Sequence, residues 1–351
     1  MLTHFIIGLL LATSVFLAFI EERLNDKQRL FILCGYALVM IILATTKSIE
    51  HTADAINYEA MFYHNENTLA EIATEPTFIY LSRLIIACGG TFTILLFVYA
   101  ILSIPLKLKA LTTITPYIFT ALLIYIPVYF EIHDMIQIRT AVAAAFLLTA
   151  IITQCRKKYL LTVLLVICAI LFHYSALAFV PMLIIGNRKM NKYMRITVAV
   201  LVPIGFAMYI LKKDLFSLIP SALVYGKLDL YQKMSEKGEW QELAILYKNL
   251  YFMSKCAMLY ACLFYYDYIV KRHQMAPLLI NLFAASILFI LTMSTIPVLA
   301  GRVSDLYGII DCIVFTFILY LAEPKYLGRI AIALLGTYVF FYNMLLNEYF
   351  T

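Results

Sequence analysis

Long apolar segments separated by short clusters of charge dominate this sequence of 351 residues. The hydrocarbon core of a bilayer is about 30 Å thick, so a helix needs roughly 20 apolar residues to cross it. Runs close to that length recur along the whole chain, 64% of whose residues are hydrophobic and only 14% charged. Because a helix satisfies its own backbone hydrogen bonds within lipid, this pattern predicts an all-α, polytopic integral membrane protein.

We predict about ten transmembrane helices within one membrane domain that covers residues 1–351. The predicted spans are Leu2–Ile20, Leu30–Thr46, Thr91–Leu106, Thr115–Phe130, Met135–Gln154, Ile196–Leu211, Leu250–Val270, Pro277–Val298, Leu306–Ala322 and Ile330–Leu346. Several are short, which predicts tilted helices or a locally thinned bilayer. The first span lacks the features of a cleaved signal peptide, so we expect it to be retained.

Basic residues between the spans indicate the orientation of the chain. They gather at residues 21–29, 107–109, 155–158, 187–195, 271–273 and 323–329. Placing all of these clusters in the cytoplasm gives a consistent alternation with both termini outside. Two long segments, 47–90 and 212–249, then face the periplasm, and the second contains Trp240.

The segment Tyr159–Ile185 lies between two of these basic clusters, although it contains polar side chains in "FHYSAL". Two full spans do not fit into roughly 27 residues, so we predict a helical hairpin that crosses only part of the bilayer, with its apex near His173. Counting the helical rise places His173 about 22 Å and Arg139 about 25 Å from the basic cluster at 155–158. Both side chains should therefore lie at similar depth, toward the periplasm.

The first outer segment carries a helix face with acidic and phenolic side chains. Glu50, Asp54 and Tyr58 follow one another at i, i+4 spacing, which places them on one face of a helix. A solvated helix face is the alternative interpretation. Glu75 then precedes a proline at an expected helix start, and Arg83 follows within that helix.

A second polar group stands at the beginning of the span Met135–Gln154. It consists of Glu131, His133, Asp134, Gln137 and Arg139. A buried arginine needs a carboxylate or a phosphate partner, so Arg139 either binds a phosphate or forms a structural ion pair. His173 likewise either takes part in chemistry or is hydrogen-bonded within the helix bundle.

A third polar group accompanies the span Leu306–Ala322. Arg302 precedes this span on its outer side, and Tyr307 and Asp311 follow at i, i+4 spacing. We expect Asp311, inside the membrane, to pair with a neighbouring side chain rather than contact a substrate.

Together these residues favour chemistry on a lipid-linked diphosphate sugar. Arginines bind diphosphates through planar, bidentate hydrogen bonds, and a histidine or carboxylate can deprotonate a hydroxyl nucleophile. The seven cysteines form no CxxC pair and no zinc-type spacing, so we expect neither a metal nor a disulfide framework. The net charge of +6 is spread over the short basic clusters, so we expect no nucleic-acid partner.

The order of these motifs resembles the EpsG-type family of bacterial exopolysaccharide and O-antigen polymerases, the Wzy class. The matching elements are Asp54 and Tyr58, Glu75-Pro76, "QIRTAVAAA" with Arg139, "FHYSAL" with His173, and Arg302 with Tyr307. The resemblance extends over about residues 50–310, and each motif is short. Thr140 departs from it, because glutamine commonly stands there in the family.

The resemblance implies a metal-independent glycosyltransferase in the bacterial inner membrane with its active site facing the periplasm. Its substrate would be an undecaprenyl-diphosphate-linked oligosaccharide, and the growing chain would move onto a new lipid-linked unit. Arg139 and Arg302 would hold the donor diphosphate, and either His173 or Asp54 would be the base. The remaining expected substrate-binding residues are Glu75, Tyr58, Glu131, His133, Arg83, Tyr307 and Trp240. We expect membrane lipid and a chain-length regulator protein as further partners, and no cofactor.

Three other functions would also place ionisable groups in a membrane. A flippase or proton-coupled transporter is the first, but the chain has no inverted repeat and its polar groups cluster near one face. A membrane O-acyltransferase using His173 is the second, although the predicted cytoplasmic loops are short. A structural assembly partner is the third, and it leaves the matched depth of Arg139 and His173 unexplained.

Overall fold

The computed structural model describes residues 2–47, 53–63, 74–213, 249–293 and 297–346, and these residues form helices and no strand. The predicted all-α fold is therefore confirmed. The chain folds into two compact units: unit 1 consists of residues 1–183 and 315–351, and unit 2 of residues 184–314. The single membrane domain expected from the sequence stays a prediction.

Unit 1 contains most of the helices. They are α1 (Leu2–Ile20), α2 (Asp26–Thr46), α3 (Ala53–Tyr63), α5 (Pro76–Ala87), α6 (Phe92–Ile114), α7 (Ile118–Ile124), the π-helix η1 (Tyr125–Ile136), α8 (Ile138–Cys155), α9 (Tyr159–Phe172), the 3-10 helix η2 (Tyr174–Phe179), η6 (Phe315–Phe317), α18 (Ile318–Leu321) and α19 (Lys325–Leu346). The short α10 (Pro181–Ile185) continues from unit 1 into unit 2.

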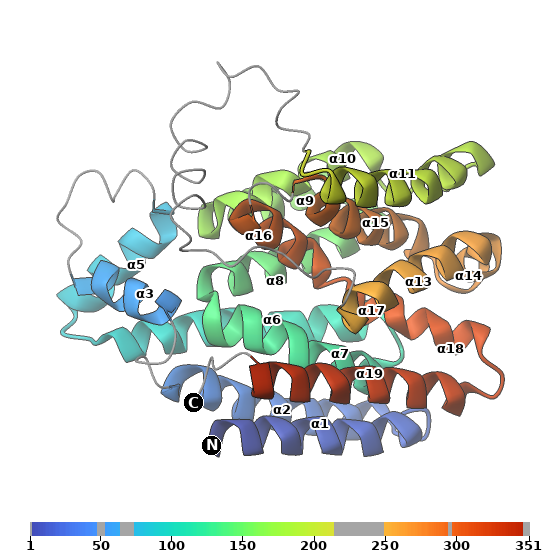
Figure 1. Cartoon of the computed structure of the whole chain (residues 1–351). Helices are drawn as coiled ribbons and strands as arrows, with labels where there is room; N and C mark the ends of the chain where they lie inside the picture. The colour runs from blue at the N-terminus through green and yellow to red at the C-terminus, as the bar shows by residue number, and fades with distance from the viewer. Residues whose placement is uncertain (1, 48–52, 64–73, 214–248, 294–296, 347–351) are drawn as a thin grey trace. The chain divides into compact units, whose positions relative to one another are not determined.

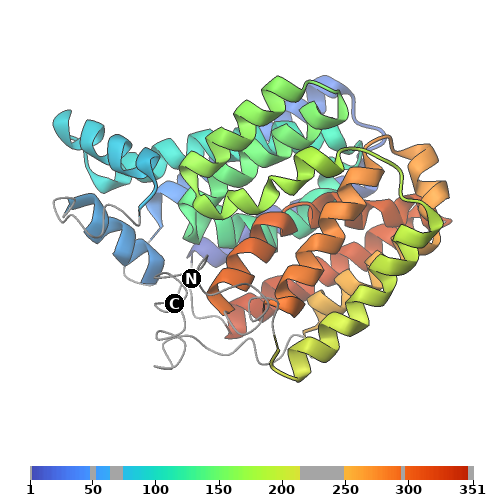
Figure 2. The ribbon, with the colours of Figure 1, turned by 90° about the horizontal axis from the view of Figure 1, so that it is seen from above.

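The long helices of unit 1 pack in successive layers (Figure 1). Helices α1 and α19 pack on α7, α2 lies along α6, α6 along α8, and α8 along α9. Helices α3 and α5 lie at the end of the unit where α6 begins, which the view from above also shows (Figure 2). The most enclosed segments are α7, η1 and α8, which lie in the middle of these layers.

Unit 2 is organised around one central helix. Its helices are α11 (Lys192–Ile210), α13 (Leu250–Phe264), α14 (Tyr266–Arg272), α15 (Ala276–Thr292), α16 (Pro297–Gly308) and α17 (Asp311–Val314). Helix α15 contacts all the others. It approaches α11 closely at Gly205, where a Cβ atom would lie only 3.0 Å from that of Leu291. A small residue is therefore what allows these two helices to pack at this point.

By length and composition, seven helices of the described residues could cross a membrane, or up to eight if the bent pair Ala300–Gly308 and Asp311–Leu321 is one span. The polytopic class is thus confirmed, whereas the count of about ten is not. The difference arises in unit 2, where Leu250–Phe264 and Ala276–Thr292 are apolar but shorter than the helices counted as spans. Helix α2 also begins at Asp26, earlier than predicted, because Asn25 and Gln28 form a capping box there.

The segment before α8 differs from the predicted connection between two spans. Instead of ending at Phe130, the helix continues as a π-helix to Ile136, and α8 begins after a break at Gln137 (φ −96°, ψ 67°). Its polar side chains find partners inside unit 1, so the backbone need not leave the bundle. As a result, 94% of the residues in an 18-residue window of Ile118–Ile136 are buried.

The predicted turn at His173 is present. Helix α9 ends at Phe172, and His173 adopts an extended conformation (φ −156°, ψ 117°) before the chain reverses through η2 and α10. The returning 3-10 helix η2 packs back on α9. The hairpin therefore presents His173 at its apex.

Candidate functional site

A single carboxylate, that of Glu75, connects the polar groups from three parts of unit 1. Glu75 is the residue before α5, and Pro76 occupies the first helical position, where its missing N–H costs no hydrogen bond. The Glu75 side chain makes no cap interaction with its own helix. Its Oε1 lies 2.9 Å from Nδ1 of His173, and its Oε2 accepts a hydrogen bond from Nη1 of Arg139.

Arg139 belongs to the first turn of α8, and its side chain is 13% exposed. The guanidinium carbon lies 4.8 Å from the ring centre of Tyr58 and 5.6 Å from that of Phe78. Such cation–π contacts contribute roughly 0.5–2 kcal/mol each. Its Nε is buried, and no hydrogen-bond partner for it exists among the residues that the structure describes. The guanidinium thus keeps a donor that Glu75 does not use.

His173 is held by both its backbone and its ring. Its side chain is 7% exposed, and the amide of the next residue, Tyr174, also donates to Oε1 of Glu75 at 3.3 Å. A second link joins α5 to the hairpin, because the Thr77 hydroxyl donates to the carbonyl of Leu171 at 2.7 Å. These contacts hold the beginning of α5 against the hairpin apex.

Aromatic side chains surround this cluster and exclude water from one side of it. The rings of Tyr58 and Phe78 lie 5.9 Å apart, Phe78 and Tyr99 lie 6.4 Å apart, and Tyr99 meets Phe172 edge-on at 5.8 Å. All belong to, or pack against, one buried hydrophobic cluster formed by α3, α5, α6 and α8. Charges in such surroundings interact more strongly than in water.

The electrostatics of the cluster favour an ionised Glu75. Burial alone raises the pKa of this carboxyl, but the hydrogen bond with His173 and the charges of Arg139 and His173 outweigh it and lower the pKa to about 2. The carboxylate in turn compensates the buried charge of Arg139. The sequence left open whether Arg139 pairs with a carboxylate or a phosphate; in the structure it is paired with Glu75.

The other residues expected in unit 1 occupy different places. Asp54 lies on α3, and its charge acts on Lys47, whose pKa burial lowers to about 8. Glu131 accepts a hydrogen bond from Asn343 of α19 at 3.0 Å, and His133 packs on Tyr129. Arg83, also expected to bind substrate, is an exposed residue of α5.

Unit 2 contains the third polar group. Arg302 and Tyr307 lie on α16, where the Tyr307 ring packs 5.3 Å from that of Phe289. Asp311 is fully buried and pairs with Lys255 at 2.9 Å, while the Tyr251 hydroxyl donates to it at 2.8 Å. The expected pairing of Asp311 with a neighbour is therefore confirmed. Glu50 and Trp240 lie outside the described residues.

Unit 1 contains a second buried ion pair that the sequence pattern does not predict. Lys107 Nζ lies 2.7 Å from Asp134 Oδ2, and both side chains are completely buried. Ser103 donates to the other carboxylate oxygen at 2.5 Å, and Tyr125 donates to Oδ2 at 2.8 Å. The sequence pattern instead predicts that Lys107 belongs to a cytoplasmic basic cluster at 107–109. Helix α6 continues for seven residues past Lys107, to Ile114. A longer predicted helix would therefore have placed Lys107 inside the bundle.

No group of three or more His, Cys, Asp or Glu side chains suited to a metal ion occurs within the described ranges. Metal-independence itself stays a prediction. The functional groups of the Glu75 cluster are thus a carboxylate, a guanidinium, an imidazole and the aromatic rings around them.

The helices and this ionic cluster define an all-helical, polytopic membrane protein with a buried Glu–Arg–His site. The profile of the EpsG family matches residues 5–350, and the chain belongs to that family. Searches of curated proteins and of solved structures each gave no match. Family membership supports, in general terms, a membrane protein of the polysaccharide-polymerase type.

Proposed function

We propose that this protein is an O-antigen or exopolysaccharide polymerase of the inner membrane, acting at the periplasmic face. The observation that carries the proposal is the convergence of Arg139 and His173 on Glu75. Its substrates are undecaprenyl-diphosphate-linked oligosaccharides, in keeping with the EpsG family. Such a reaction needs a cation to stabilise the leaving diphosphate and a base to deprotonate the attacking hydroxyl. Arg139 suits the first role and His173 the second.

In the proposed reaction, a hydroxyl at the non-reducing end of the new unit attacks the anomeric carbon of the growing chain. The bond between that carbon and the diphosphate oxygen breaks, and undecaprenyl diphosphate leaves with the electron pair. His173 takes the hydroxyl proton. With Nδ1 protonated and bonded to Glu75, the basic lone pair of the ring is at Nε2, as in other carboxylate-oriented histidines.

Arg139 is proposed to stabilise the charge that develops on the leaving diphosphate. Its Nη1 is committed to Glu75, whereas its buried Nε adds a donor directed away from that bond. Tyr58 and Phe78 hold the guanidinium plane in place. Arg302 of α16 stays a predicted second phosphate ligand, and Asp54 stays the alternative base.

The test uses cells that lack this gene, complemented with wild type, His173→Asn or His273→Asn, with membrane levels checked. Asparagine places an amide near the position of Nδ1 but supplies no base. His273 is a matched control, because it too is buried and closes a helix in an extended conformation (φ −134°, ψ 106°).

We expect wild type and His273→Asn to restore a ladder of long surface polysaccharide chains, and His173→Asn to leave single repeat units. Loss of a general base typically reduces rate by about 10²–10⁴-fold. A full ladder with His173→Asn would remove the histidine from the mechanism. A null strain that makes a normal ladder, or lacks even the single unit, would place the protein at another step.

A further inference from the structure

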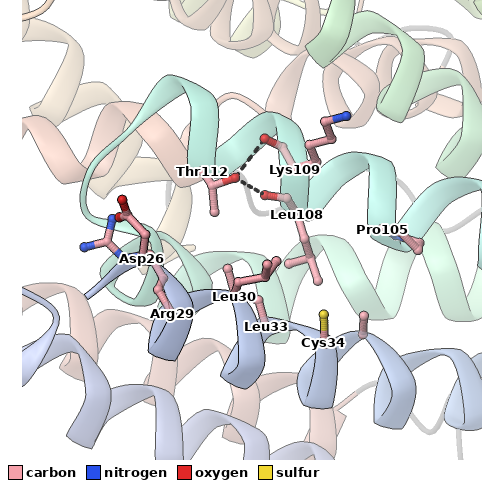
Figure 3. A pocket seen from close by; sticks show the side chains of 10 residues that line it. Asp26, Arg29, Leu30, Leu33, Cys34, Pro105, Leu108, Lys109 and Thr112 are labelled. Carbon is pink, nitrogen blue, oxygen red and sulfur yellow. Dashed lines mark hydrogen bonds between the residues drawn. The ribbon is translucent and has the colours of Figure 1, made fainter. Parts of the chain in front are cut away.

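A cavity of about 470 Å³ opens between α2 and α6, at the ends of these helices remote from the Glu75 cluster (Figure 3). It is lined by Asp26, Arg29, Leu30, Leu33, Cys34, Ala37, Pro105, Leu108, Lys109 and Thr112. On each helix the lining positions include an i, i+3, i+4, i+7 series, so one face of each helix forms a wall. Leu30, Cys34, Pro105 and Lys109 are exposed, so the cavity opens on the surface of the protein.

The polar and apolar linings of this cavity are separated along the helix axes. The charged residues lie where α2 begins and α6 ends, within about 8 Å of those ends by the helical rise of roughly 1.5 Å per residue. Ala37 and Pro105 lie further in, about 16 Å and 13 Å from the same ends. A polar end at the membrane surface with an apolar groove extending inward matches a phospholipid, headgroup first.

The charges at the polar end are complementary to one particular headgroup. Two cations, Arg29 and Lys109, accompany one carboxylate, Asp26. Arg29 donates through Nη2 to the carbonyl of Glu21 at 3.2 Å, while its buried Nε has no acceptor among the described residues. Figure 3 shows Asp26 and Arg29 together at the beginning of α2, whereas the Lys109 side chain on α6 extends away from them.

We propose that this cavity binds a glycerophospholipid with a primary-ammonium headgroup, from the leaflet at which α2 begins. Arg29 binds its phosphate, and exposed Lys109 adds a second positive charge at the same end of the cavity. Asp26 accepts hydrogen bonds from its ammonium, and one acyl chain lies along Leu33, Ala37 and Leu108. Arginine and lysine are the usual phosphate ligands. The trimethylammonium of a choline headgroup cannot donate a hydrogen bond to Asp26, so the site selects against choline lipids.

The test titrates the full-length protein, delipidated in detergent, with phosphatidylethanolamine and phosphatidylcholine of identical acyl chains. Bound lipid is counted by native mass spectrometry. We expect phosphatidylethanolamine to bind at least about fivefold more tightly than phosphatidylcholine, and Asp26→Asn to abolish that difference. Arg29→Gln/Lys109→Gln should weaken binding of both lipids about tenfold or more, as expected when charge-assisted hydrogen bonds are lost.

Two further variants separate the cavity from the general surface. Arg23→Gln/Lys27→Gln removes the same charge from exposed positions outside the cavity and should bind lipid as wild type does. Ala37→Phe leaves all charges in place but fills the groove, and should reduce binding as strongly as the charge variant.

The proposal is overturned if wild type binds the two lipids equally, or if the control double variant loses as much binding as the cavity variant. It is also overturned if glycerophosphoethanolamine, which has no acyl chains, competes as well as the lipid. Dimers of the protein in place of lipid adducts would assign the cavity to a second copy of the chain instead.

Discussion

Glu75 Oε1 lies 2.9 Å from Nδ1 of His173, although the two residues are 98 positions apart, and the other oxygen of the same carboxylate accepts from Arg139, 64 positions away. Three segments of the chain thus meet on one side chain. The arrangement resembles carboxylate-oriented histidines in that the acid sets the tautomer and direction of the ring. It differs in that the same acid also compensates a buried arginine.

Replacing Glu75 by glutamine should damage both stability and activity. The neutral amide leaves the charge of Arg139 buried without a counterion, which costs about 3 kcal/mol or more. It also no longer favours the His173 tautomer needed for a base. Thermal unfolding of the purified protein and the polysaccharide ladder measure the two effects. Glu59→Gln, the same change on α3 outside the cluster, should leave both unchanged; equal losses in both variants would contradict a special role for Glu75.

The stability contributed by Glu75 should depend on pH at the acid end only. Its folded-state pKa of about 2 lies below the ordinary value of 4.5, so the stabilisation is complete above pH 4.5 and is lost as pH falls toward 2. The shift corresponds to roughly 3 kcal/mol. Unfolding of wild type and Glu75→Gln, compared across this range in detergent, should show a stability difference that shrinks with acidification. A difference independent of pH would mean that Glu75 is not ionised in the folded protein.

The buried Lys107–Asp134 pair should be costly to break on one side only. Lys107→Met leaves the Asp134 carboxylate without its counterion in a completely buried site, which we expect to destabilise unit 1 by about 3–5 kcal/mol. Lys107→Met/Asp134→Asn removes both charges while the amide can still bond Ser103 and Tyr125, so most of the stability should return. Additive losses in the thermal unfolding of Lys107→Met, Asp134→Asn and the double variant would refute coupling between the two residues.

The orientation inferred from the basic clusters can be checked with native cysteines. Cys88 is exposed directly after α5, which the proposed topology places in the periplasm, and Cys155 ends α8 beside the cytoplasmic basic cluster. In variants that keep Cys88 or Cys155 as the single cysteine of the whole chain, a membrane-impermeant maleimide should label Cys88 in intact cells and Cys155 only after lysis in denaturant. The reverse pattern would mean that the chain has the opposite orientation in the membrane, with the Glu75 cluster at the cytoplasmic face.

The sequence by itself determined the class of this protein, because the length and spacing of apolar runs leave only membrane-spanning helices. It also placed the hairpin apex at His173 and put His173 and Arg139 at one depth, since helical rise can be counted along the chain. Both expectations agree with the observed geometry at Glu75.

Tertiary structure alone decided which partner each buried charge has. Nothing in the local pattern around Glu75 shows that its two oxygens are shared between α8 and the hairpin, because those contacts join positions far apart in sequence. The same holds for Lys107, whose neighbours in sequence are typical of a cytoplasmic loop but whose ammonium is buried against Asp134. A buried charge is stabilised only by groups brought close to it in three dimensions, and packing of the helices determines those groups.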